Sequence, residues 1–248
     1  MDKQYAILLL AGDSSRRKEK EKKQFILLGK KERFLYSLDT FFSCSFFTKI
    51  VLVIKKEDEE HVKQRTSSYP KGRILFAYGG KDRSESVRNG LKRLDEELEE
   101  HSFVFIHDGD RPFVSKELLF QLKEKEKEAD AITLIDPVYD SILRKEGESI
   151  AYVDRKNVYL VQTPQVFSSA ILKEILNEKK SATDDFQLAL AKGFKTAFIL
   201  GERKNFKITD SKDLERAEML SFAKENKQDW LYTRRFLVFS ILFLRIEF

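Results

Sequence analysis

The alternation of short, continuous apolar runs with longer stretches of helical periodicity is the feature that most constrains the fold of this chain. Apolar runs without polar alternation are typical of strands that are buried on both faces of a parallel sheet. They occupy residues 5–10, 50–54, 73–77, 103–106, 131–135 and 196–200. Helices are expected at residues 34–42, 57–66, 84–97, 116–127, 168–178, 184–191 and 211–225. This pattern predicts an α/β fold: a three-layer sandwich with a mostly parallel, Rossmann-like sheet and a ligand site at the carboxyl ends of the strands.

One segment, residues 137–161, interrupts this rhythm. It alternates apolar and polar residues and contains a turn at Gly147, so we expect a β-arm inserted in the domain.

Because no repeat or linker is visible, residues 1–227 are predicted to form one domain, followed by a hydrophobic C-terminal tail at residues 228–248. The apolar run in this tail, 236–244, has nine residues, whereas a transmembrane helix needs about 20. No transmembrane span is expected, and a docked element, an interfacial anchor and a frayed end stay open for the tail.

The net charge and the cysteine content limit which binding partners and which cellular compartment we expect for this protein. The 248 residues contain 46 Lys and Arg against 41 Asp and Glu, a formal net charge of +5 that is mixed along the chain. A nucleic-acid interface usually has a clustered basic patch, so we expect no nucleic-acid partner and find a small anionic substrate compatible. Cys44 is the only cysteine, which excludes an intrachain disulfide. Together with the lack of a leader before the first apolar run, this favours a cytoplasmic location.

Small residues follow the first predicted strand. Ala11 and Gly12 begin a turn whose backbone N–H groups are suited to a phosphate or a base edge. The turn matches neither the dinucleotide Gly-x-Gly-x-x-Gly pattern nor a P-loop. Arg16 and Lys23 lie seven residues apart after it, where they can converge on one polyphosphate. The alternative is that residues 18–23 are a solvated run of charges.

A second small-residue turn, Gly79 and Gly80, follows the third predicted strand and leads into a helix whose N-terminus favours anions. An ordinary turn with Ser84 as the helix cap explains this pattern equally well. At the end of the next strand, Asp108 is placed to hold a hard divalent cation such as Mg²⁺. His107 beside it is interpreted as a structural histidine, since the three histidines of the chain are scattered.

Further polar clusters lie beside apolar segments at residues 162–165, 183–185 and 205–209. Each of them alone is compatible with a turn or a helix cap. Lys207 is the most suggestive of these residues, because it lies between apolar neighbours in a strand-like stretch. The sequence contains no Gly-x-Ser-x-Gly elbow, so a serine hydrolase of that type gains no support.

Taken together, these clusters resemble the 2-C-methyl-D-erythritol 4-phosphate cytidylyltransferase family, which has a nucleotidyltransferase and glycosyltransferase-A-like fold. The resemblance covers roughly residues 5–220 and consists of nine blocks in the order of the family. The blocks are residues 10–16, 22–24, 79–87, 107–112, 137–141, 153–155, 162–165, 183–185 and 205–209. Each block is short, and their combined order makes the resemblance specific.

The resemblance implies a nucleotidyltransferase in which a sugar phosphate attacks the α-phosphorus of CTP and pyrophosphate leaves. It implies catalytic roles for Arg16, Lys23, Arg155 and Lys207, and Mg²⁺ bound by Asp108. The cytidine nucleotide would contact Ala11, Gly12, Gly80, Arg83 and Ser86, and the acceptor would contact Asp140, Ser141, Thr163 and Thr183. By the same resemblance, Arg155 reaches the site from the β-arm of a second subunit, so a homodimer is implied.

Several positions depart from the pattern of the family. Ser14 replaces a loop glycine and Lys22 a proline, while Gly109 and Asp110 replace two alanines. Lys81 and Ser141 are further departures. A ribitol-5-phosphate cytidylyltransferase, which differs in its acceptor, is one alternative interpretation. An inactive nucleotidyltransferase-like protein that binds a partner or a membrane through its tail is a second one, against which the retained cations argue.

Overall fold

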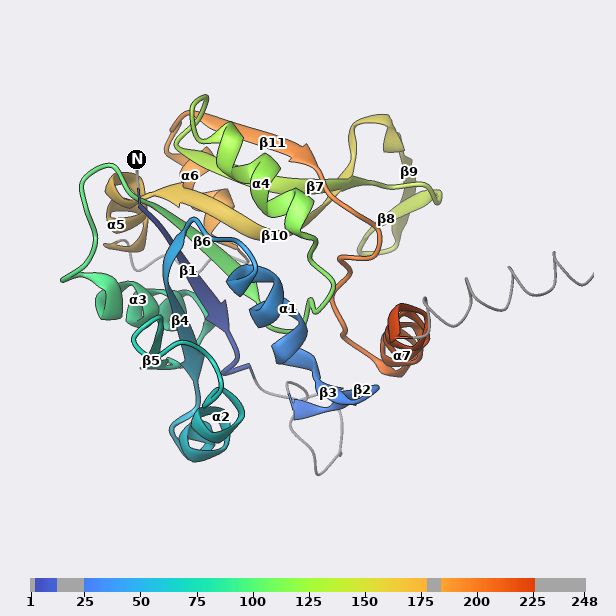
Figure 1. Cartoon of the computed structure of the whole chain (residues 1–248). Coiled ribbons are helices and arrows are strands. Elements are labelled where there is room, and N and C mark those ends of the chain that lie inside the picture. Colours follow the sequence, from blue (N-terminus) through green and yellow to red (C-terminus); the bar gives the residue numbers. More distant parts are fainter. Residues whose placement is uncertain (1–2, 13–24, 178–183, 226–248) are drawn as a thin grey trace, which may run out of the picture.

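The computed structural model describes residues 3–12, 25–177 and 184–225 (Figure 1). In this part of the chain, seven strands form one sheet in the order β11-β7-β10-β6-β1-β4-β5. They are β1 (Gln4–Leu9), β4 (Phe47–Ile54), β5 (Ile74–Tyr78), β6 (Phe103–Asp108), β7 (Ala131–Pro137), β10 (Tyr159–Ser168) and β11 (Thr196–Leu200). All neighbouring pairs are parallel except those that β10 makes with β6 and β7. The predicted mostly parallel sheet is therefore confirmed.

Helices cover both faces of this sheet. They are α1 (Arg33–Phe42), α2 (Glu59–Arg65), α3 (Arg83–Leu94), α4 (Lys116–Lys125), α5 (Ser169–Asn177) and α6 (Asp185–Ala191), and a further helix, α7 (Ser211–Glu225), lies beside them. Along β1, Ala6 and Leu8 pack with α1, α2 and α4, whereas Tyr5 and Ile7 pack with α3, α5 and α6. The side chains of β1 thus pack in two separate cores, one on each face of the sheet, which is why the sequence of this strand is apolar without alternation. The three-layer sandwich is confirmed.

The predicted arm is a hairpin of β8 (Ile142–Glu146) and β9 (Ser149–Val153), and Figure 1 shows it projecting beyond the large sheet. Gly147 lies at its turn with φ +60°, a conformation that side chains other than glycine rarely adopt. The short 3-10 helix Arg155–Asn157 then leads into β10, whose first residues pair with the end of β7.

Helix α7 packs in a third, smaller apolar cluster rather than on the sheet. This cluster joins Ala217 of α7 to Tyr36 of α1, Phe113 and Leu28. Leu28 belongs to a small hairpin that sequence analysis did not predict, formed by β2 (Leu27–Leu28) and β3 (Lys31–Glu32). Asp210 caps this helix, because the Asp213 N–H donates to Asp210 Oδ1 over 2.9 Å.

The structure differs from three local interpretations of the sequence. Residues 162–165 are not a turn or a cap but the middle of β10, where the pairing with β7 shifts register and the Thr163–Pro164 peptide bond is cis. Lys207 lies not in a strand but in a loop between β11 and α7, and the neighbouring Ile208 N–H donates to the Asp110 carbonyl over 2.9 Å. Asp82, not Ser84, caps α3, since its carboxylate accepts from the Glu85 N–H over 2.7 Å.

Candidate active site

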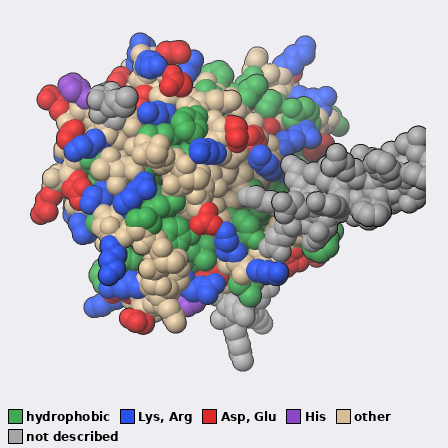
Figure 2. All heavy atoms as spheres, viewed as in Figure 1, with side chains coloured by type: hydrophobic (Ala, Val, Ile, Leu, Met, Phe, Trp, Pro, Cys, Tyr) green, Lys and Arg blue, Asp and Glu red, His purple; other side chains and the backbone are tan. Residues whose placement is uncertain are grey.

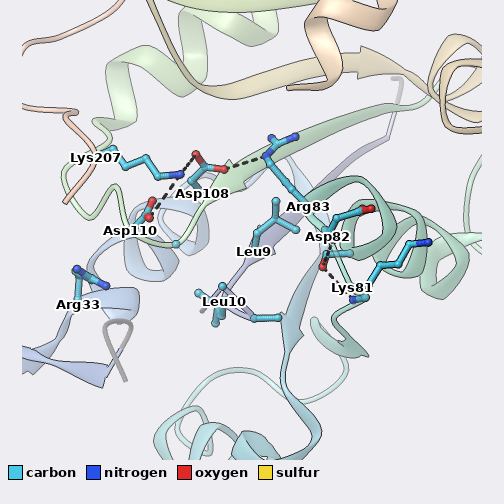
Figure 3. Close-up of a pocket in the computed structure, with 14 residues that line it drawn as sticks. Leu9, Leu10, Arg33, Lys81, Asp82, Arg83, Asp108, Asp110 and Lys207 are labelled. Carbon is cyan, nitrogen blue, oxygen red and sulfur yellow. Dashed lines mark hydrogen bonds and ion pairs between the residues drawn. The ribbon is translucent and has the colours of Figure 1, made fainter. Parts of the chain in front are cut away.

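A cavity of about 370 Å³ opens at the carboxyl ends of β1 and β6 (Figure 3). These strands are neighbours at the point where the strand order reverses, which is where open α/β sheets bind ligands. Seven of the predicted site residues line it: Ala11, Gly12, Gly80, Arg83, Ser86, Asp108 and Lys207. The other lining residues are Leu9, Leu10, Arg33, Lys81, Asp82, Gly109 and Asp110.

Asp108, the last residue of β6, is surrounded by three cations. Its Oδ2 accepts from Lys207 Nζ over 3.1 Å and its Oδ1 from Arg83 Nε over 3.4 Å, and Arg111 Nε lies 3.8 Å away. Burial alone would raise the pKa of this carboxyl, but Arg83, Lys207 and Arg111 outweigh burial and hold the pKa of Asp108 well below its usual range. Asp108 is therefore a carboxylate at every physiological pH.

The loop that carries Lys207 is fixed by hydrogen bonds to the neighbouring strands. Arg111 Nη1 donates to the Asn205 carbonyl over 2.9 Å. The buried Asn205 amide in turn donates to the Thr163 carbonyl over 2.8 Å and to Gln162 Oε1 over 3.2 Å. Because these contacts join the loop to β10 and to the end of β6, the Lys207 ammonium is directed at Asp108.

Arg83 approaches Asp108 from the opposite side, at the start of α3 (Figure 3). Its Nη1 donates to Oδ2 of Asp185, a fully buried residue at the start of α6, over 2.5 Å. Burial alone would lower the pKa of Arg83, but the Asp185 and Asp108 carboxylates outweigh it and raise that pKa. The guanidinium thus joins two helix N-termini to the end of β6, so that its position in the cavity is set by two carboxylates.

The turn before α3 lies against the turn after β1. A Cβ atom on Gly79 would come within 2.3 Å of the Ala11 Cβ, so only glycine allows this approach. The Gly80 N–H donates to Ser86 Oγ over 3.0 Å, and Ser86 Oγ donates to the Asp82 carbonyl over 2.9 Å. These contacts hold the backbone of both turns at one wall of the cavity.

His107 lies directly behind Asp108 and is fully buried. Its Nε2–H donates to the Arg111 carbonyl over 3.0 Å, and its Nδ1 accepts from Thr163 Oγ1 over 3.1 Å. Thr163 Oγ1 also accepts from the Asp108 N–H over 3.1 Å. Burial lowers the pKa of His107 to about 4, so the ring is neutral at pH 7. The interpretation of His107 as a structural histidine is confirmed, and Thr163 is placed behind Asp108 rather than on the cavity wall.

The remaining predicted residues are not on this wall. Asp140, Ser141 and Arg155 lie on the exposed arm, where Arg155 donates to the Tyr139 carbonyl. Within one chain they do not meet Asp108, as expected if an arm serves a second subunit. Arg16, Lys23 and Thr183, together with Ser14, Lys22 and the tail, lie outside the described residues. The predicted roles of all these residues stay predictions.

Sequence analysis missed Arg33, Asp82 and Asp185. Asp185 belongs to the polar cluster at residues 183–185 that the sequence shows, but its pairing with Arg83 could not be predicted from the sequence. Asp82 precedes α3 at the usual distance for a cap and could have been found by this spacing. Arg33 at the start of α1 gave no signal, because a polar residue at a helix start is ordinary.

The residues around Asp108 fit a Mg²⁺ ion that is shared with substrate phosphates. Mg²⁺ in such sites uses one or two carboxylates and fills its other positions with phosphate oxygens and water. Asp108 is ionised, and the nearby Asp110 has a buried Oδ1 with no hydrogen-bond partner among the residues that the structure describes. No group of three or more His, Cys, Asp or Glu side chains able to hold a metal occurs in the same part of the chain.

The chain belongs to the class of nucleotidyltransferases with a glycosyltransferase-A-like fold. This class is indicated by the strand order, by the two small-residue turns and by Asp108, which lies among cations where the strand order reverses. The family model for 2-C-methyl-D-erythritol 4-phosphate cytidylyltransferase matches residues 5–221. The chain belongs to this family.

Individual relatives agree with the family match. An enzyme of this name from Thermotoga neapolitana is 35% identical over 217 residues, which are 87% of this chain and 96% of the relative. The one from Halalkalibacterium halodurans is 34% identical over 90% of this chain and all of the relative. The crystal structure of 4-diphosphocytidyl-2C-methyl-D-erythritol synthase from Anaerococcus prevotii superimposes with a TM-score of 0.75 at 28% identity, over 88% of this chain and 98% of that one.

Proposed function

We propose that this protein transfers CMP from CTP to 2-C-methyl-D-erythritol 4-phosphate, forming 4-diphosphocytidyl-2-C-methyl-D-erythritol and pyrophosphate for non-mevalonate isoprenoid synthesis. The observation that carries the proposal is the placement of Asp108 between Lys207 and Arg83 in a cavity at the strand ends. Family membership and the names of the relatives supply the substrates.

The reaction needs positioning and charge stabilisation rather than a covalent nucleophile. An oxygen of the acceptor phosphate forms a bond to the α-phosphorus while the bond from that phosphorus to the bridging oxygen of the β-phosphate breaks. Pyrophosphate leaves with the electron pair. Cations that are fixed before the reaction stabilise the charge on the transferred phosphoryl group at little reorganisation cost. Lys207 and Arg83 meet this requirement, since hydrogen bonds to carboxylates hold both.

The turns at Ala11 and Gly80 would hold the cytidine nucleotide, because their backbone lines the cavity with Ser86 beside it. Arg16 and Lys23 would neutralise the triphosphate. Lys207 and Arg155 would position the acceptor phosphate, with Asp140, Ser141, Thr163 and Thr183 close to the acceptor. These roles rest on the match to the family blocks.

Asp108 would hold Mg²⁺ together with the nucleotide phosphates. When bound, the ion supplies Lewis acidity and a fixed geometry for the phosphate oxygens. Lys207 and Arg83 keep Asp108 ionised, so the carboxylate needs no deprotonation before it binds the ion. Addition of EDTA should abolish activity and excess Mg²⁺ should restore it. Activity that survives EDTA would argue against this role of Asp108.

A homodimer through the arm is proposed as well. Leu143, Ile150 and Tyr152 share one face of the β8–β9 hairpin and are 57, 63 and 79% exposed. Phe198 and Leu200 on the edge strand β11 are exposed too. Figure 2 shows apolar and basic side chains together on the surface at the upper right. An exposed apolar group of this kind supports a protein interface. Sedimentation should show a dimer that Tyr152→Asp dissociates.

The decisive experiment measures pyrophosphate release from CTP and Mg²⁺ with methylerythritol phosphate and, in parallel, with ribitol 5-phosphate. The proposal expects turnover with the first acceptor. Turnover only with the second would favour the ribitol enzyme, and no turnover with either acceptor would favour an inactive binding protein.

No helix in the described residues has both the length and the apolarity to cross a membrane. A cytoplasmic location stays a prediction from the sequence.

A further inference from the structure

Arg33 is a buried cation in the cavity, and part of its guanidinium has no partner among the residues that the structure describes. It is the first residue of α1, its side chain is only 1% exposed, and it lines the cavity with Asp110 and Lys207 (Figure 3). Among residues 3–12, 25–177 and 184–225, its Nε and Nη1 atoms have no hydrogen-bond partner. The position of Arg33 is nevertheless defined, because its backbone N–H donates to the Ile26 carbonyl over 3.0 Å.

Burial of an unpaired guanidinium is unfavourable for folding. A buried polar group without a hydrogen bond costs free energy, and a buried charge costs more. Burial lowers the pKa of Arg33 to about 10, and the Asp110 carboxyl opposes this shift. Arg33 therefore still carries its charge at pH 7. Among the described residues, no carboxylate lies within ion-pair distance of Arg33, so none of them forms an ion pair with this cation.

We propose that Arg33 is a further substrate-binding residue, which donates hydrogen bonds to phosphoryl oxygens in the cavity. This inference rests on the proposed function. A guanidinium presents donors in a planar fork that matches two phosphate oxygens, and hydrogen bonds between charged groups are the stronger ones. Its Nε and Nη1 atoms are unpartnered donors, and each of them can donate to a phosphoryl oxygen.

The position of Arg33 determines which phosphates are candidates. In Figure 3, Arg33, Asp110 and Lys207 lie on one side of Asp108, and Arg83, Asp82 and Lys81 lie on the other. Lys207 is the residue proposed for the acceptor phosphate, so Arg33 lies on the same side as that phosphate. The triphosphate of the nucleotide carries the same chemical group, and separate measurements distinguish these two sources.

The test compares wild-type protein with Arg33→Leu, Arg33→Lys and Arg93→Leu. Arg93 is exposed on α3 outside the cavity, and its substitution removes the same charge. Calorimetry measures binding of inorganic pyrophosphate and of CTP, and steady-state kinetics give the KM for the acceptor. We expect Arg33→Leu to weaken pyrophosphate binding or to raise the acceptor KM by about 10- to 100-fold. Arg33→Lys should recover part of the loss, while Arg93→Leu should change neither value.

Thermal unfolding separates binding from folding. Because an unpaired charge is replaced by an apolar side chain, Arg33→Leu should be at least as stable as the wild type. If both affinities are unchanged in this variant, the proposal is wrong. Pyrophosphate binding does not depend on turnover, so an acceptor that fails to react would contradict the proposed function without deciding the role of Arg33.

Asp110 provides the second control, because Arg33 could act only as its counterion. In that case the effect of Arg33→Leu on phosphate binding would disappear in an Asp110→Ala background. A residue that contacts phosphate directly should lose a similar factor in both backgrounds. Disappearance of the effect in Asp110→Ala would overturn the proposal, and a retained loss would support it.

Discussion

Lys207 Nζ lies 3.1 Å from Asp108 Oδ2, although the two residues are 99 positions apart in the chain. The ammonium also lies 3.6 Å from Asp110 Oδ2. One lysine from the loop after β11 thus forms ion pairs with two carboxylates, at the end of β6 and just after it. The side chain of Lys207 is 40% exposed, so its ammonium can contact both the protein and a ligand in the cavity.

Replacement of Lys207 by Met should lower kcat/KM for cytidylyl transfer by about 10²- to 10³-fold, as loss of one preorganised charge donor does in other enzymes. The loss should appear in the KM of the acceptor and in kcat rather than in the binding of CTP. Steady-state kinetics with each substrate varied in turn measure this difference.

Lys204→Met is the matched control, because Lys204 lies in the same loop and pairs with Glu202 over 3.1 Å outside the cavity. It should leave kcat/KM close to the wild-type value. An equal loss in both variants would indicate that the loop, and not the Lys207 charge, is responsible.

The Arg83–Asp185 pair should contribute strongly to stability. Asp185→Ala leaves Arg83 with Asp108 as its remaining counterion, and removal of one partner from a buried pair typically costs about 3–5 kcal/mol. Urea denaturation should therefore show a lower free energy of unfolding by an amount of this order. The double substitution Arg83→Met with Asp185→Leu should recover much of the loss, since no unpaired charge is left.

Asp95→Ala is the comparison for this stability measurement. Asp95 pairs with Lys173 at 3.7 Å on the surface, and both side chains are about half exposed. Exposed pairs contribute about 0–1 kcal/mol. A loss in Asp185→Ala as small as that in Asp95→Ala would mean that water reaches Arg83 in the folded protein.

Most of the sheet could be predicted because six of its seven strands are apolar runs. The strand β10 could not, since Gln162, Thr163, Pro164 and Gln165 give its middle the composition of a turn. These side chains are buried, and Gln162 and Thr163 make hydrogen bonds that only the fold creates, such as the one from the Asn205 amide to Gln162. Pro164 is accommodated where the pairing with β7 shifts register. A local pattern contains none of this information.

The residues of the candidate site could likewise be predicted only in part. Asp108, Gly80 and Ala11 could be predicted because chemistry in a parallel sheet gathers after strand ends. Lys207 was identified from its apolar neighbours, although the expected strand is a loop. Arg33 could not be identified, because its burial depends on how the start of α1 packs beside residues far away in the chain.

The stability of the protein should fall as pH decreases from about 6.5 to about 4, in part because of His107. Its pKa is lowered to about 4 in the folded protein, mainly by burial. The unfolded chain therefore binds a proton at this ring below about pH 6.5, whereas the folded protein does so only below about pH 4. The hydrogen bond to the Arg111 carbonyl and the charge of Asp108 oppose this lowering of the pKa, and the charge of Arg111 adds to it.

The contribution of His107 between pH 7 and pH 5 should be about 2 kcal/mol. Urea denaturation without added metal measures it as the difference in pH dependence between the wild type and His107→Gln. The variant should have a lower free energy of unfolding at pH 7 and a smaller decrease towards pH 5. Parallel pH profiles would show that His107 binds its proton equally well in the folded state.

Two inactive variants should restore activity to each other if each site combines Lys207 of one subunit with Arg155 of the other. Arg155→Ala and Lys207→Met homodimers would each lack one required cation in both sites. In a heterodimer, one site has both cations and the other has neither. After equal amounts are unfolded and refolded together, about a quarter of the wild-type activity should return.

Mixing the two variants without unfolding should restore less, because subunit exchange limits the yield of heterodimers. Refolding of each variant alone provides the baseline. If co-refolding restores no activity while sedimentation shows dimers, Arg155 does not serve the site of its partner, and the arm has only a structural role at the interface.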